Sequence, residues 1–108
     1  MHADGIWKIE ELASEDWESV GTVFLENGLY LRGGVDAYTV GRYALDGDTI
    51  SITATSTRLG GVRSVYGKAV GEIQITIRGE LKDDEINAQG TDGTHSVRYR
   101  YTRLGDMP

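Results

Sequence analysis

Two runs of alternating apolar and polar residues flank the dipeptide Asp46-Gly47 within residues 41–52. A type I′ turn needs positive φ at both central residues, which glycine adopts freely and aspartate more readily than most residues. An Asp-Gly pair between alternating runs therefore predicts a β-hairpin. With a two-residue turn we expect Tyr43 opposite Ile50 and Gly41 opposite Ile52. This pairing places the apolar residues of both strands on one face.

The same pattern recurs along the chain. Residues 73–81 alternate Ile, Gly and Leu with polar residues without a break, and Asn27-Gly28 marks a second tight hairpin. Residues 13–18 are polar and predict a turn, with one turn of helix as the alternative. A bulge near Gly41 would bring Tyr38 and Tyr43 to the same side of their strand. Eight strands are expected, starting near residues 5, 20, 29, 37, 49, 73, 85 and 95.

The order of these strands indicates the fold class. Eight sequential antiparallel strands with one apolar face each predict an all-β, eight-stranded up-and-down barrel, because closure removes exposed strand edges. A two-sheet β-sandwich of the same strands is the alternative. At 108 residues the chain is expected to form a single domain, 1–108, with a flexible tail at 1–4 and a second tail at 105–108.

Composition narrows the classes of function. The formal net charge of −6 argues against direct nucleic-acid binding, which needs a concentrated basic surface. No apolar run is long enough to cross a membrane, and the first residues lack the pattern of a signal peptide, so we expect a cytoplasmic protein. The absence of cysteine excludes disulfides, thiolate catalysis and cysteine-based zinc sites.

The first expected strand carries a motif known from other barrels. Gly5-Ile6-Trp7 resembles the Gly-x-Trp of the lipocalin and calycin barrels, in which the tryptophan plugs the closed end and a basic residue near the C-terminus packs across it. The first and last strands are neighbours in a closed barrel. The resemblance therefore implies packing of Arg103 on Trp7, with Arg100 as the second candidate.

A wider resemblance covers almost the whole chain. The segments that carry it are Gly5-Ile6-Trp7-Lys8-Ile9, Gly28-Leu29-Tyr30-Leu31-Arg32-Gly33-Gly34-Val35-Asp36, Tyr38-Thr39-Val40-Gly41-Arg42-Tyr43 and Gly47-Asp48-Thr49-Ile50. In order and spacing they are similar to the GrlR-like family of bacterial lipocalin-like barrels. That family takes its name from a negative regulator of type III secretion, which binds and restrains a DNA-binding transcriptional activator.

The resemblance implies a non-enzymatic regulator that acts by protein–protein contact, for which a homodimer is one arrangement. The founding regulator uses an exposed Glu-Asp-Glu-Asp run to bind its partner. This sequence departs from that pattern, since its nearest acidic runs are Asp83-Asp84-Glu85 and Glu15-Asp16. Asp83, Asp84 and Glu85 remain candidates for a partner surface. So do Arg58, Arg63 and Lys68, which lie in a stretch, residues 49–71, without any acidic residue.

The alternative function is a carrier or sensor of a small apolar or amphipathic ligand inside the barrel. An eight-stranded barrel is either filled by its own side chains or holds one small ligand. The short strands and many aromatic residues favour a filled interior over an open one. If a cavity exists, its candidate ligand contacts are Tyr38, Tyr43, Tyr99 and Tyr101.

No catalytic, cofactor or metal site is predicted. A triad of Asp92, His95 and Ser96 would need separated segments to converge, whereas neighbouring residues of one strand point to opposite faces. A cation site at Asp83, Asp84 and Glu85 lacks the further oxygen ligands that a hard cation takes at loop spacing. An enzyme is therefore not expected.

Overall fold

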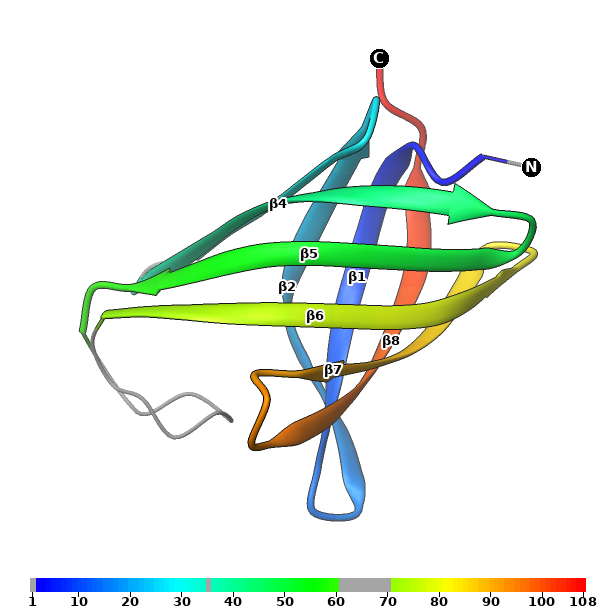
Figure 1. Ribbon diagram of the computed structural model, residues 1–108. Helices are drawn as coiled ribbons and strands as arrows, with labels where there is room; N and C mark the ends of the chain where they lie inside the picture. Colours follow the sequence, from blue (N-terminus) through cyan, green and yellow to red (C-terminus); the bar gives the residue numbers. More distant parts are fainter. Residues whose placement is uncertain (1, 35, 61–70) are drawn as a thin grey trace.

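A computed structural model describes residues 2–34, 36–60 and 71–108, and it is a closed eight-stranded antiparallel β-barrel (Figure 1). Every strand pairs with its neighbour in sequence, and β8 pairs with β1 to close the barrel. The predicted barrel is confirmed over the β-sandwich alternative. The strands are β1 (Gly5–Ala13), β2 (Asp16–Glu26), β3 (Leu29–Gly33), β4 (Ala37–Asp46), β5 (Thr49–Arg58), β6 (Gly71–Lys82), β7 (Glu85–Thr91) and β8 (Ser96–Gly105).

The up-and-down order sorts the connections between two ends of the barrel. The turns after β2, β4 and β6 lie at the end that holds the start of β1 and the end of β8, and we call this the closed end. The β1–β2, β3–β4 and β7–β8 turns and the facing ends of β5 and β6 lie at the other end, which we call the mouth. Figure 1 shows the β4–β5 and β6–β7 turns together on one side of the molecule.

The central hairpin has the predicted faces but a different register. Its turn is Gly47-Asp48, so that Tyr43 lies opposite Ile52 and Gly41 opposite Ala54. The expected pairing was therefore wrong by two residues. Positive φ occurs at Gly47, 60°, and not at Asp48, which is the pattern of a type II′ turn with glycine first. Because side chains alternate with a period of two, the shift leaves the inward residues unchanged.

The predicted turn at residues 13–18 is much shorter in the structure. Only Ser14 and Glu15 lie between the paired strands, and Ser14 adopts the positive φ of 56° that the tight turn needs. The strands continue to pair beyond the expected bounds, because Trp17 packs on the outer surface beneath the guanidinium of Arg100, 4.5 Å from its ring centroid. This contact stabilises an extended backbone in a segment whose polar composition predicted a loop.

The bulge expected near Gly41 is absent, since β4 pairs with β5 in an unbroken register from Ala37 to Asp46. A Cβ at Gly41 would overlap the backbone of β5, so this glycine permits close approach of two strands. Tyr38 consequently faces outward and Tyr43 faces inward. Register shifts occur instead on β1, between Ile9 and Glu10 against β2 and near Trp7 against β8.

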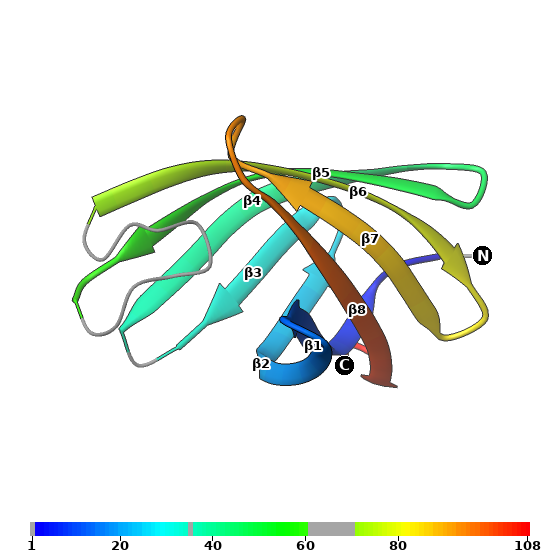
Figure 2. The same cartoon turned by 90° about the horizontal axis from the view of Figure 1, so that it is seen from below.

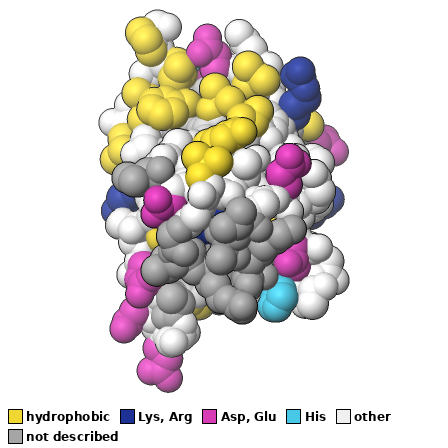
Figure 3. All heavy atoms as spheres, turned by 90° about the vertical axis from the view of Figure 1, so that its left-hand side faces the viewer, with side chains coloured by type: hydrophobic (Ala, Val, Ile, Leu, Met, Phe, Trp, Pro, Cys, Tyr) yellow, Lys and Arg dark blue, Asp and Glu magenta, His cyan; other side chains and the backbone are white. Residues whose placement is uncertain are grey.

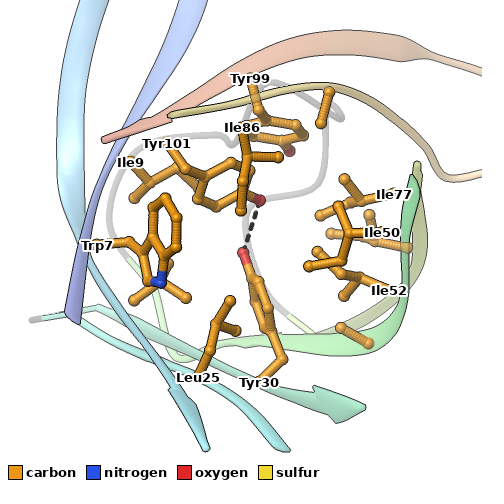
Figure 4. Close-up of a cluster of buried hydrophobic side chains, with 14 of the residues drawn as sticks. Trp7, Ile9, Leu25, Tyr30, Ile50, Ile52, Ile77, Ile86, Tyr99 and Tyr101 are labelled. Atoms are coloured by element: carbon orange, nitrogen blue, oxygen red, sulfur yellow. Dashed lines mark hydrogen bonds between the residues drawn. The ribbon is translucent and has the colours of Figure 1, made fainter. Parts of the chain in front are cut away.

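The inward residues fill much of the barrel with a continuous core (Figure 4). Two buried tyrosines meet at its centre, where the Oη atoms of Tyr30 and Tyr101 lie 2.9 Å apart and the rings are edge-on, 6.4 Å between centroids. Figure 4 shows these rings pointing toward each other between Trp7 on one side and isoleucines on the other. The most deeply buried side chains are Trp7, Ile9, Val23, Leu25, Tyr30, Ile50, Ile52, Leu81, Ile86 and Tyr101.

The closed end is capped by the packing that the Gly-x-Trp resemblance implies. The guanidinium carbon of Arg103 lies 4.4 Å from the centroid of the Trp7 ring, so the predicted pair is confirmed. Arg103 also donates hydrogen bonds to the backbone carbonyl oxygens of His2 and Asp4, at 2.9 and 2.6 Å. Residues 2–4, expected as a tail, lie against the barrel, and Ala3 is only 2% exposed.

Candidate functional site

The mouth half of the barrel contains a cavity of about 370 Å³. This volume falls at the lower end of the range of small-molecule sites, roughly 300–1,000 Å³. The interior is therefore filled toward the closed end and hollow toward the mouth, which combines the two alternatives that the sequence left open. Its described lining residues come from β1 to β6, from β8 and from the β3–β4 turn.

One wall of the cavity is apolar. It consists of Ala54 on β5 and the side chains of Ile73, Ile75 and Ile77 on β6, whereas Tyr99 on β8 lines the cavity next to Glu11. The unbroken alternation of β6 turns every second residue inward, and all three isoleucines are buried. Figure 2 shows β5 and β6 across the barrel from β1 and β2. The apolar wall thus faces the strands that carry Glu11 and Glu18.

The opposite wall carries charge. Glu11 on β1 is 9% exposed, Glu18 pairs with it directly across from β2, and Arg32 comes from β3. The Nη1 atom of Arg32 lies 3.7 Å from Oε1 of Glu11, while Nη2 donates a 3.1 Å hydrogen bond to the carbonyl of Val20. Burial raises the pKa of Glu11 above its ordinary value, and the nearby Arg32 guanidinium offsets part of this effect.

Tyr30 connects the cavity to the core beneath it. Its side chain borders the cavity, and its hydroxyl pairs with that of Tyr101. Burial raises the pKa of both phenols, so both stay neutral at physiological pH. A neutral hydroxyl pair adds hydrogen-bonding capacity to the cavity without adding charge.

The four tyrosines predicted as ligand contacts occupy three different environments. Tyr99 lines the cavity, and Tyr38 borders its rim although 47% of the residue is exposed. Tyr101 belongs to the core, and Tyr43 lies near the closed end, where its hydroxyl bonds to the carboxylate of Asp4. Tyr43 and Tyr101 do not border the cavity, so Tyr38 and Tyr99 are the two of the four that a ligand in it would meet.

Sequence reasoning missed the polar residues of the cavity. Glu11 shares the inward parity of Trp7 and Ile9, and this signal was present in the sequence. An acidic residue at an inward position is uncommon, because burying a carboxylate is costly unless it is paired. Arg32 reaches the cavity from a half-buried position on a strand of five residues, where no sequence pattern indicated a site.

The predicted partner residues do not form one surface. Arg58 is half-buried and lines the mouth of the cavity, whereas Arg63 and Lys68 lie outside the described residues. Asp83, Asp84 and Glu85 are exposed at the β6–β7 turn, at the closed end. There Asp84 accepts a 2.9 Å hydrogen bond from Nε of Arg103. Arg58 and the acidic run therefore belong to opposite ends of the barrel.

The β7–β8 turn explains the grouping of Asp92 and His95. The Asp92 carboxylate accepts hydrogen bonds from the backbone N–H groups of Thr94 and His95, at 2.8 and 2.6 Å. These bonds lower the pKa of Asp92 to about 2. The carboxylate thus serves to shape the turn. Within residues 2–34, 36–60 and 71–108, no three His, Asp or Glu side chains gather as metal ligands.

The outer surface carries an apolar row that the sequence analysis did not identify. Phe24, Leu31 and Val40 are direct cross-strand neighbours on β2, β3 and β4, and they are 39%, 39% and 48% exposed. Leu29 and Tyr38 are exposed on the same two hairpins. Figure 3 shows hydrophobic side chains gathered on the upper part of one face of the molecule. We refer to Phe24, Leu31 and Val40 as the outer apolar row.

Comparison with known proteins gave no assignment, because no family model and no curated protein matches the chain. The likeness to the GrlR-like family therefore depends on the segments quoted above. In the described part of the chain, no helix is long and apolar enough to cross a membrane.

Proposed function

We propose that this protein binds a small amphipathic molecule in the mouth of its barrel. The observation that carries the proposal is the cavity of about 370 Å³ between an apolar wall on β5 and β6 and a charged wall on β1, β2 and β3. Ligand sites are typically concave and mostly apolar, with a few polar groups that fix orientation. A molecule with an apolar body and a polar head matches the two walls.

Native mass spectrometry and calorimetric titration with decanol test this function. Ser56 lines the cavity on β5, so Ser56→Trp should fill it and abolish binding. Thr53 is exposed on the same strand and faces outward, so Thr53→Trp is the matched control and should bind as the wild type does. A wild type that binds no apolar compound, or a Ser56→Trp variant that binds normally, would refute the proposal.

The outer apolar row favours a second function, regulation by protein contact. Exposed apolar residues that adjoin on three strands are typical of interaction surfaces. The GrlR-like resemblance implies a transcriptional activator as the partner, with a second copy of this chain as the alternative. The carboxylates at the β6–β7 turn lie on other strands than this row, and Asp84 is already paired with Arg103, which directs the proposal to the apolar surface.

Substitution within the row tests the second function. Val40→Asp should abolish the contact, whereas Thr76→Asp, at an exposed position on β6, should leave it intact. Light scattering of the purified protein reports self-association, and co-purification with a candidate activator reports the heterologous contact. If Val40→Asp changes neither measurement relative to Thr76→Asp, the row is not the interaction surface.

A further inference from the structure

Glu11 is the most deeply buried of the carboxylates that line the cavity. Glu11 is 9% exposed and lines the charged wall from β1. Burying a carboxylate is costly unless hydrogen bonds or an opposite charge compensate it. The contacts of this side chain therefore indicate which ligand chemistry the cavity favours.

The protein itself compensates Glu11 incompletely. The closest cation, Nη1 of Arg32, lies 3.7 Å away, beyond the 2.7–3.2 Å of an N–H···O hydrogen bond. Another nitrogen of the same guanidinium is already bonded to the Val20 carbonyl, which limits how far Arg32 can turn toward the carboxylate. Arg32 is therefore a long-range ion-pair partner of Glu11, and the separation leaves room for a second, closer donor.

The surroundings of Glu11 add further negative charge. Glu18 lies directly opposite on β2, and Asp36 lines the cavity from the β3–β4 turn. The described lining residues thus contain three carboxylates against two guanidinium groups, those of Arg32 and Arg58. Like charges that face each other across strands are unfavourable, so one additional cation would relieve the site.

We propose, on the basis of the binding function argued above, that the cavity selects amphipathic molecules with a protonated amine, which donates hydrogen bonds to Glu11. An alkylammonium group is a compact charge with three donors, and it can approach a carboxylate that the planar guanidinium of Arg32 does not reach. The apolar body of the ligand then lies along Ile73, Ile75 and Ile77 on the facing wall.

The affinity of the cavity for an amine should depend on pH. Burial raises the pKa of Glu11; Glu18 from β2 adds to this rise, while Arg32 from β3 and Arg58 from β5 oppose it. A protonated Glu11 cannot attract an ammonium group. The affinity for an amine should therefore rise as pH increases through the raised pKa, whereas the affinity for an uncharged analogue should stay constant.

Calorimetric titrations with decylamine, decanol and decanoate separate the head group from the chain. Decylamine should bind the wild type at least about tenfold more tightly than decanol, because a charge-assisted hydrogen bond adds to the shared apolar contact. Glu11→Gln should remove this difference and keep the affinity for decanol, which also reports that the variant is folded. Glu26→Gln, the same change at the exposed last residue of β2 at the closed end, is the control and should behave as the wild type does.

Two different failures are distinguishable. Decanol or decanoate binding as tightly as decylamine, or a preference for decylamine that survives in Glu11→Gln, overturns the amine inference and leaves the binding function standing. Binding of none of the three compounds overturns the binding function itself, and the amine inference with it.

Discussion

Removing one hydroxyl from the Tyr30–Tyr101 pair should destabilise the fold more than removing both. The two residues are each 1% exposed, and their Oη atoms are 2.9 Å apart. Tyr→Phe at one position leaves the other hydroxyl buried without a partner, at a cost of about 1–3 kcal/mol. Either single variant strands the hydroxyl of the other tyrosine, so each should show a cost in this range.

Urea unfolding of the two single variants and the double variant measures this effect as a double-mutant cycle. The double variant should lose no more stability than the worse single variant, so the sum of the single losses should exceed the double loss by about 1 kcal/mol or more. Tyr38→Phe removes a largely exposed hydroxyl and should change stability by less than about 0.5 kcal/mol. Additive losses, or single losses as small as that of Tyr38→Phe, would refute the argument.

Three further predictions concern the strands, the closed end and one turn. Gly41→Ala should cost about 1–3 kcal/mol in thermal unfolding because its Cβ overlaps the β5 backbone, whereas Gly33→Ala, with open space around it, should be nearly neutral. Arg103→Met should cost about 2 kcal/mol in urea unfolding through the lost ring contact and hydrogen bonds, and Arg98→Met, which is exposed, should cost little. An NMR titration of the Asp92 carboxyl should give a pKa of about 2. The stability that this carboxylate contributes should be lost as pH falls from its pKa in the unfolded chain toward that value. An ordinary pKa for Asp92 would contradict the turn geometry.

The sequence predicted the faces of the strands better than their register. Alternation along β6 determines which residues point inward whatever the neighbouring strand does, and its five inward positions are all buried. The register of the central hairpin depends on which two residues form the turn. Asp46-Gly47 and Gly47-Asp48 are both favourable turn pairs. The structure uses Gly47-Asp48, with the residue of positive φ, Gly47, in the first turn position.

The candidate site was only partly predictable for a related reason. Parity places Tyr43, Tyr99 and Tyr101 inside the barrel, but it does not tell which end of the barrel each one occupies. That depends on strand direction together with the tilt and stagger of the closed sheet. The hollow mouth likewise follows from the summed sizes of residues on many strands. Among the charged residues of the site, Glu11 was one whose inward position the local pattern did indicate.

The location of both chain ends beside the Trp7–Arg103 cap has a practical consequence. Anything joined to either end of this chain, whether additional residues, an affinity tag or a sensor surface, departs from the closed end and leaves the mouth pointing away. The protein can therefore be immobilised without obstructing its cavity. The described turns at the mouth contribute no residue to the cap. Their sequences can therefore be varied to display new recognition loops while the closed end stays unchanged.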